Sequence, residues 1–334
     1  MIQALSTSNS RYIVKIIKFI IILGLIIVSA WILANQLDDD VNHIKSLWHD
    51  IYALENNSVD IVFLGSSHAN SSFDTEVFYN ITGNTSFNLG SSSQTPANGY
   101  HILREFLKRQ NPRILVQEIY WDVMTEDIEV SAVNSQHLTY MRPGANGAAI
   151  FFNTLSPKEK ETFIMKGLNP FYRLKGITIR KLSSRSEVVE DFQTIQYKGR
   201  GFRPYMITAN GDRINEVIER LNNFSGYSEE QIAYLQRTID LAQSRGMKVI
   251  LVMAPIMPEV FNGLSCYDEV EQVSREIARD NNIDYIDFNI LIKNKEINIP
   301  SDYFGDEHHV NYKGAIILST YLAKYIKSNG ILDE

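Results

Sequence analysis

The chain has 334 residues, of which 44% are hydrophobic and 21% are charged, a composition that suits one large or two small globular domains. Its formal net charge of -7 gives no reason to expect a nucleic-acid partner. The single cysteine, Cys266, excludes an intramolecular disulfide and any metal site built from several cysteines.

The amino-terminal segment has the composition of a membrane-spanning helix. From Ile13 to Ala34 the sequence is apolar except for Lys15, Lys18 and a few small residues. Basic residues lie on its amino side and the acidic run 38–40 lies on its carboxyl side, which places the amino terminus in the cytoplasm.

Two alternatives compete with an anchor. A cleaved signal peptide needs small residues at the cut, which residues 28–30 offer, but the apolar run continues through 31–33. A buried core helix would show a polar face, and none interrupts the run. The sequence therefore favours an uncleaved single-pass anchor in the cytoplasmic membrane, with a cytoplasmic tail and transmembrane segment over 1–37 and an extracytoplasmic domain over 38–334.

Five apolar runs predict the strands of one sheet. These runs are residues 60–64, 86–89, 112–122, 248–255 and 284–288. Segments with helical periodicity, such as 95–110 and 268–280, separate them, so the strands are parallel and joined by right-handed crossovers. We predict an α/β fold, namely a three-layer α/β/α sandwich of the flavodoxin-like type around a five-stranded parallel sheet.

A stretch of about 100 residues, 123–225, interrupts this alternation with loops and short helices. Its aromatic residues include Phe151, Phe152, Phe171, Tyr172, Tyr197, Phe202 and Tyr205. They fit either a lid or substrate platform over the sheet or a small core within the insertion, and the sequence leaves both open.

A candidate nucleophile follows the first predicted strand. The run 60–64 stops at Gly65, and Ser66 and Ser67 follow. A buried strand that ends in glycine turns sharply and presents the next side chains to solvent. Serine at such a place is also a common turn former and helix cap, so the motif alone does not decide between these roles.

A candidate base and its orienting carboxylate lie near the other end of the chain. Asp306 and His309 are three residues apart, just before an amphipathic helix predicted over 312–327. In an open parallel sheet, ligands bind outside the carboxyl ends of the strands, where these residues and Ser67 all fall. The sequence therefore predicts a triad of Ser67, His309 and Asp306.

Three short motifs resemble those of the SGNH/GDSL superfamily of serine esterases and acyltransferases. They are Gly-Ser-Ser at 65–67, Asn-Leu-Gly at 88–90, and Asp306-x-x-His309 with Asn311 and Gly314. The anchored layout looks like SGNH-like proteins that modify cell-envelope polymers, including the D-alanine transfer protein of teichoic acid modification. The resemblance covers most of the chain from residue 60 on, except the insertion, and implies the SGNH variant of the flavodoxin-like fold.

The resemblance also implies a role for each residue. Ser67 would be the nucleophile, His309 the general base and Asp306 the group that orients the imidazole. The backbone N–H groups of Ser67 and Gly90 would donate to the oxyanion. No cofactor is expected.

Two positions depart from the pattern of the family. Ser66 stands where many members have aspartate, a change that envelope-modifying members tolerate. The third block usually supplies an asparagine that donates to the oxyanion, but here the predicted strand ends with Glu118 and Asp122. An ionised carboxylate cannot donate a hydrogen bond, so either Gln94 or a backbone amide substitutes, or the site is weak or altered.

Other polar residues fall at the same predicted edge. The candidate substrate-site residues are His68, Gln94, Glu118 and Asp122. His68 could assist the nucleophile, although adjacency in sequence does not give the geometry of a base, and Glu118 and Asp122 could equally brace the sheet. His308 beside His309 could ligate a metal, but adjacent histidines rarely point to one centre, and we predict no metal site.

These features predict a serine-dependent esterase or O-acyltransferase that acts on a cell-envelope or extracellular polysaccharide through an acyl-serine intermediate. The expected partners are an acylated glycan or glycan acceptor and the membrane, and the resemblance implies a membrane-bound acyltransferase. The rival hypothesis is a noncatalytic binding or assembly protein with a degenerate site. The missing asparagine of the third block favours this rival, and the intact triad argues against it.

Overall fold

The computed structural model describes residues 2–37, 43–125, 134–169, 171, 174, 177 and 194–332. The chain divides into two compact units, one of residues 1–41 with 160–189 and one of 42–159 with 190–334. The acidic run 38–40 lies outside the described residues, so the predicted domain boundary at 37 stays a prediction.

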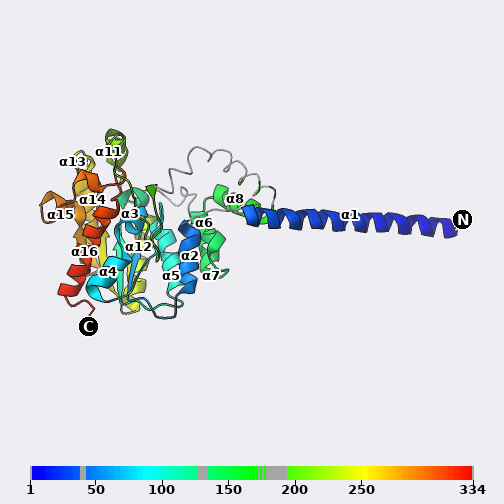
Figure 1. Ribbon diagram of the computed structural model, residues 1–334, viewed down its shortest axis with the longest axis horizontal. Helices are drawn as coiled ribbons and strands as arrows, with labels where there is room; N and C mark the ends of the chain where they lie inside the picture. Colours follow the sequence, from blue (N-terminus) through cyan, green and yellow to red (C-terminus); the bar gives the residue numbers. More distant parts are fainter. Residues whose placement is uncertain are drawn as a thin grey trace. The chain divides into compact units, whose positions relative to one another are not determined.

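The first unit contains one long helix, α1 (Ile2–Leu37) (Figure 1). Its segment Val14–Ala34 is long and apolar enough to cross a membrane, with a hydropathy of 2.8 over its best window. Large side chains along it, such as Phe19 and Leu25, are exposed. A signal sequence would have the same properties, so the anchor and the signal peptide both remain open.

The second unit is built on a five-stranded parallel sheet with the order β2-β1-β3-β4-β5. The strands are β1 (Ile61–Leu64), β2 (Ser86–Asn88), β3 (Ile114–Glu118), β4 (Lys248–Met253) and β5 (Asp284–Asp287). Nearly all residues of the central strands are buried, as expected for a parallel sheet covered on both faces. The predicted sheet is confirmed.

The third strand is shorter than predicted. It pairs with β4 as far as Glu118, and the 3-10 helix η1 (Trp121–Met124) follows instead of further strand. Ile119, Tyr120 and Trp121 are apolar because they are buried in the core, not because they belong to the sheet. The prediction that the strand runs to residue 122 was therefore wrong.

Helices cover both faces of the sheet (Figure 1). On one side α5 (Pro96–Phe106) packs against α12 (Glu229–Ser244), and on the other α16 (Tyr312–Ser328) packs against α3 (Ser67–Ser72) and α4 (Thr75–Thr82). The chain moves across the sheet in one direction from β1 to β2 and in the other direction from β2 onward. Because each crossover is right-handed, the connecting helices fall on opposite faces of the sheet in the two cases. The predicted three-layer α/β/α sandwich is confirmed.

The remaining described helices are α2 (His43–Ala53), α6 (Asn134–Tyr140), α7 (Ala145–Asn153), α8 (Pro157–Leu168), α11 (Ile214–Asn222), α13 (Pro258–Asn262), α14 (Tyr267–Asp280), α15 (Phe288–Lys293) and the 3-10 helix η3 (Ser301–Tyr303). The predicted insertion 123–225 holds α6, α7, α8 and α11. Within it, residues 126–133, 170, 172–173, 175–176 and 178–193 lie outside the described residues, and Tyr172 is among them.

The candidate site lies at the carboxyl ends of β1 and β3, where the order of strands across the sheet reverses. Connections leave β1 toward β2 and then cross back to β3, which opens a crevice beyond the carboxyl ends of β1 and β3. Leu64 pairs with Gln117 in these two strands. The next residues, Gly65 and Glu118, therefore meet directly beneath this crevice.

Candidate active site

Ser67 is held at the edge of the sheet by a tight turn. Ser66 is the N-cap of α3, and its side chain accepts a hydrogen bond from the backbone N–H of His68. Gly65 leaves no room for a side chain, because a Cβ there would lie 2.7 Å from the Cβ of Glu118. Strand, glycine and cap together present Ser67, which is half-buried, as the first residue of the helix.

The structure brings Ser67, His309 and Asp306 into one hydrogen-bonded chain. Ser67 Oγ lies 2.7 Å from His309 Nε2, and His309 Nδ1 lies 2.8 Å from Asp306 Oδ2. Asp306 Oδ1 also accepts the backbone N–H groups of His308 and His309 at 2.9 and 2.7 Å. The order hydroxyl, imidazole, carboxylate is that of a nucleophile, its base and the group that orients the base.

The electrostatics of Asp306 suit this order. Burial opposes its ionisation, but the charge and the hydrogen bond of His309 outweigh burial and hold the pKa of Asp306 well below its usual range. The carboxylate is therefore ionised at neutral pH and keeps the Nδ1 proton of His309 on its side. The lone pair of Nε2 then faces Ser67 Oγ.

The loop that carries His309 ends at a defined point. Asn311 is the N-cap of α16, and its side chain accepts the backbone N–H groups of Lys313 and Gly314 at 3.0 and 3.4 Å. The cap fixes the start of the helix two residues after His309.

Three aromatic rings lie against the imidazole of His309, and that of His308 is 4.1 Å away between centroids. The ring of His68 is 4.4 Å away between centroids, and the ring of Tyr205 is 5.2 Å away and nearly parallel to it. Tyr205 belongs to the predicted insertion, so the insertion reaches the candidate site. This contact favours the lid or platform interpretation for that part of the insertion.

His68 does not reach the nucleophile as a base. Its Nδ1 lies 3.3 Å from Ser66 Oγ, and its ring stacks on Tyr120 at 3.8 Å between centroids. Burial, followed by the neighbouring His309 and His308, lowers the pKa of His68 well below its usual value. His68 is therefore a neutral, buried ring behind the triad.

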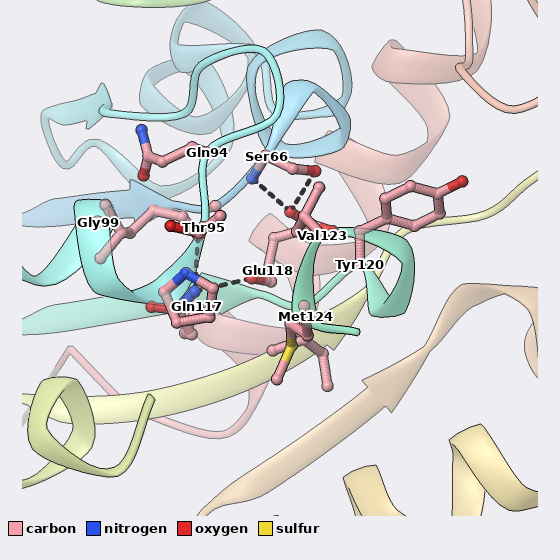
Figure 2. A pocket seen from close by; sticks show the side chains of 13 residues that line it. Ser66, Gln94, Thr95, Gly99, Gln117, Glu118, Tyr120, Val123 and Met124 are labelled. Carbon is pink, nitrogen blue, oxygen red and sulfur yellow. Dashed lines mark hydrogen bonds between the residues drawn. The ribbon is translucent and has the colours of Figure 1, made fainter. Parts of the chain in front are cut away.

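Glu118 braces the turn that carries the nucleophile (Figure 2). Its Oε2 accepts the backbone N–H of Ser66 at 2.7 Å and the hydroxyl of Ser66 at 2.9 Å. Burial raises the pKa of Glu118 to about 7, and the two hydrogen bonds from Ser66 only partly offset this effect. The structure thus places Glu118 in contact with Ser66, and not with Ser67, His309 or Asp306.

We expect Glu118→Gln to change how the stability of the protein depends on pH. The pKa of Glu118 is about 7 in the folded protein against an ordinary 4.5, so between these values the folded state holds a proton that the unfolded chain has lost. The stability of the parent therefore falls as pH rises through this window, by on the order of 3 kcal/mol. Glutamine does not titrate, so the free energy of unfolding of the variant relative to the parent should rise with pH.

Urea titrations of parent and variant at about pH 5 and about pH 8 measure this difference. Glu230→Gln, which changes an exposed glutamate on α12, serves as the control and should show no such change. A relative stability of Glu118→Gln that is the same at both pH values would contradict the buried, titrating carboxyl.

The two predicted oxyanion donors differ in their surroundings. The N–H of Ser67 belongs to the first turn of α3, where backbone N–H groups have no acceptor within the helix. The N–H of Gly90 donates to Asn88 Oδ1 at 2.9 Å. A Cβ at Gly90 would lie 2.8 Å from the backbone nitrogen of Asn70, so the loop after β2 runs directly against α3.

Gln94 and Asp122 are not hydrogen-bonded to the triad. Gln94 Nε2 donates to the carbonyl oxygen of Leu89 and to Ser91 Oγ, both at 2.9 Å, and so braces its own loop. Asp122 lies in η1 and pairs with Arg220 at 3.3 Å. Burial raises the pKa of Asp122, and Arg220 partly offsets this rise.

The sequence did not single out Asn70, which lies one helical turn after Ser67. Residues three apart share a face of a helix, so Asn70 lies on the face of the nucleophile. Its side chain is buried, and its Nδ2 has no hydrogen-bond partner among the residues that the structure describes. The spacing of three from the nucleophile was the available signal for this residue.

Three histidines, one of them His309, lie close together. His68, His308 and His309 each offer one nitrogen, and these nitrogens lie within 4.8 Å of one another. The sequence shows only the adjacent pair 308–309, and the fold adds His68 from the far end of the chain. Imidazole nitrogens of this kind suit a metal ion.

No family model matches the chain, and no curated protein sequence matches it either. Among solved structures it is similar to a GDSL-like lipase from Bacteroides thetaiotaomicron, with 12% identity, 86% of this chain and 98% of that chain covered, and a TM-score of 0.41. It is also similar to an acetylxylan esterase from Geobacillus stearothermophilus, with 10% identity, 82% and 95% coverage and a TM-score of 0.38. It is similar as well to an acetyl xylan esterase from Butyrivibrio proteoclasticus, with 9% identity, 83% of this chain and 65% of that chain covered, and a TM-score of 0.34. At these identities and TM-scores, the assignment of a function rests on the geometry of the chain itself.

Proposed function

We propose that the protein is a serine-dependent esterase or O-acyltransferase of the SGNH/GDSL type that works through an acyl-serine intermediate. The observation that carries this proposal is the hydrogen-bonded chain from Ser67 Oγ to His309 Nε2 at 2.7 Å and from His309 Nδ1 to Asp306 at 2.8 Å. The hydroxyl of Ser67, which follows the first strand, and a histidine 242 residues later meet at hydrogen-bond distance in the order that acyl transfer needs.

The first half-reaction forms the acyl-enzyme. Ser67 Oγ attacks the carbonyl carbon of an ester, and its proton passes to His309 Nε2. Asp306 stabilises the imidazolium that results, because it stays ionised. The tetrahedral intermediate then expels the alcohol, which takes the proton from His309, and the acyl group stays on Ser67.

The developing oxyanion needs hydrogen-bond donors. The N–H of Ser67 supplies one, and we assign a second to Asn70 Nδ2, the buried amide without a partner among the described residues. Asn70 would then take the place of the asparagine that the third block lacks. The N–H of Gly90, which donates to Asn88 Oδ1, would contribute by donating to the oxyanion at the same time, in a bifurcated hydrogen bond. A well-placed donor contributes about 3 kcal/mol to the transition state.

The second half-reaction passes the acyl group to water or to a glycan hydroxyl, with His309 as the base. An uncleaved anchor at Val14–Ala34 would hold the catalytic domain outside the cytoplasmic membrane, where envelope and extracellular polysaccharides are the abundant hydroxyl acceptors. The proposed partners are the membrane, an acylated glycan or glycan acceptor, and a membrane-bound acyltransferase that delivers the acyl group.

The test is an assay of the full chain in detergent micelles with p-nitrophenyl acetate, alone and with an unacetylated oligosaccharide. Hydrolysis alone indicates an esterase, and acetylated oligosaccharide indicates a transferase. The absence of both from protein whose folding has been verified by circular dichroism would contradict the proposal.

The alternative is a noncatalytic binding protein. It is favoured by the absence of the third-block asparagine and by the N–H of Gly90, which already donates to Asn88 Oδ1. Such a protein would bind the oligosaccharide without turnover, with an affinity that Ser67→Ala leaves unchanged.

A further inference from the structure

We propose that His68, His308 and His309 form a binding site for one zinc ion, and that zinc bound there stops acyl transfer by occupying the base. One nitrogen from each ring lies within 4.8 Å of the others. Imidazole nitrogens suit Zn²⁺, and three histidines with one open position are a common zinc coordination set.

Two of the three rings, those of His68 and His309, have one nitrogen that a neighbour orients. His68 Nδ1 faces Ser66 Oγ at 3.3 Å, and His309 Nδ1 faces Asp306 Oδ2 at 2.8 Å. His308 Nε2 lies 3.9 Å from Asp306 Oδ1. These contacts leave the opposite nitrogens of the rings to face other groups.

Among the described residues, the opposite nitrogens of two rings have no hydrogen-bond partner. Neither His68 Nε2 nor His308 Nδ1 has a hydrogen-bond partner among the described residues, and both atoms are buried. Buried polar atoms are rarely left unpaired, and a metal ion would satisfy both. The third ring, His309, has Nε2 directed at Ser67 Oγ.

The three rings would have to turn toward a common centre, because nitrogens bound to zinc at about 2.1 Å lie about 3.4 Å apart and those of the three rings lie within 4.8 Å of one another. Their centroids are 4.1 Å apart for His308 and His309, 4.4 Å for His68 and His309, and 5.4 Å for His68 and His308. Imidazoles that bind zinc tetrahedrally at about 2.1 Å have centres roughly 5 Å apart. The ring of His68 is also fixed against Tyr120, which limits the entropy lost on binding.

Asp306 would act as the second shell of this site. A carboxylate that accepts the other N–H of a ligating histidine orients the ring and raises its basicity as a ligand. Asp306 already does this for His309, and its ionised carboxylate places a negative charge beside the three rings.

Zinc binding and acyl transfer would both use the lone pair of His309 Nε2. His309 Nε2 takes the proton of Ser67 in acyl transfer, and the same lone pair would bind zinc. Coordination therefore breaks the hydrogen bond to Ser67 Oγ and removes the base, and a chelator restores both. Binding itself is independent of the proposed function, whereas the inhibition rests on it.

Calorimetric titration of the metal-free full chain in detergent with Zn²⁺ tests the site. We expect one ion per chain, and at least a tenfold loss of affinity in His308→Gln and in His68→Gln. His49→Gln, at an exposed histidine of α2, should bind as the parent does. An excess of Mg²⁺ should not compete, because it prefers oxygen ligands.

The absence of saturable binding, an equal loss in His49→Gln, or unchanged affinity in His308→Gln would overturn the site. The side chain of His308 is 19% exposed and so the more tolerant of substitution, which makes this variant decisive if His68→Gln does not fold.

A second assay tests the consequence. Zn²⁺ at saturating concentration should stop hydrolysis of p-nitrophenyl acetate, and excess chelator should restore it. Turnover that is unchanged by bound zinc would overturn the inhibitory role. Zinc binding without turnover in the metal-free protein would count against the esterase and leave the site standing, and turnover without zinc binding would do the reverse.

Discussion

Ser67→Ala should lower kcat for p-nitrophenyl acetate by a factor on the order of 10⁴ to 10⁶. The hydroxyl of Ser67 lies 2.7 Å from His309 Nε2, and no other hydroxyl is hydrogen-bonded to that nitrogen among the described residues. Without it no acyl-enzyme forms, and only the residual effect of the oxyanion donors and of substrate binding remains. Initial rates of the full chain, parent and variant side by side, measure the effect.

Ser71→Ala is the matched control for this variant. Ser71 lies one turn further along α3 and donates its hydroxyl to the carbonyl oxygen of Ser67, so the change removes a serine hydroxyl from the same helix without touching His309. Its kcat should stay within about tenfold of the parent, since only a local hydrogen bond is lost. A Ser67→Ala protein that keeps a tenth or more of the parent activity would exclude Ser67 as the nucleophile.

Asp306→Asn should lower kcat by about 10⁴-fold with little change in KM. The side-chain amide of asparagine at this place donates a hydrogen bond to His309 Nδ1. Nδ1 must therefore be unprotonated, and the ring proton of His309 lies on Nε2. His309 then presents a donor to Ser67 and cannot take its proton. The shape of the site is nearly unchanged, so the loss appears in kcat.

Steady-state kinetics of Asp306→Asn measure this effect, with Asp302→Asn as the control. Asp302 is an exposed aspartate in η3, four residues earlier in the chain, and its substitution should leave kcat close to that of the parent. Asp306→Asn with parental kcat, or with a loss confined to KM, would show that Asp306 does not set the tautomer of His309.

The parts of the site that follow from local sequence were predictable. A strand that ends in Gly65, a serine pair at the start of a helix, and Asp306 three residues before His309 each have a local signature. The parallel sheet then brings them together, because its connections place every such turn at the same edge. The triad geometry and the three-layer fold therefore follow from short patterns and one topological rule.

The rest depends on contacts between segments that are distant in sequence. Nothing in the sequence shows that Glu118 turns inward to accept both hydrogen bonds from Ser66, since this follows from the register of β1 against β3. The strand that ends at Glu118 was extended to 122 because buried residues of a 3-10 helix are as apolar as those of a strand.

The rings around His309 are a second case of this kind. The ring of His68 packs on Tyr120. Tyr205, which contacts His309, belongs to an insertion that has no periodic pattern. Sequence adjacency placed His68 near Ser67 but could not give the direction of its ring. Only tertiary packing decides which side chains face the imidazole.

Ser67 as an activated nucleophile is tested most directly by locating a fluorophosphonate adduct. The full chain is treated with the probe, digested and analysed by mass spectrometry, with His309→Ala treated in parallel and a known serine esterase as a positive control. We predict one adduct, on Ser67, that His309→Ala reduces to background. No labelling of the folded protein while the control esterase reacts, or an adduct on Ser66 or elsewhere, would contradict this role of Ser67.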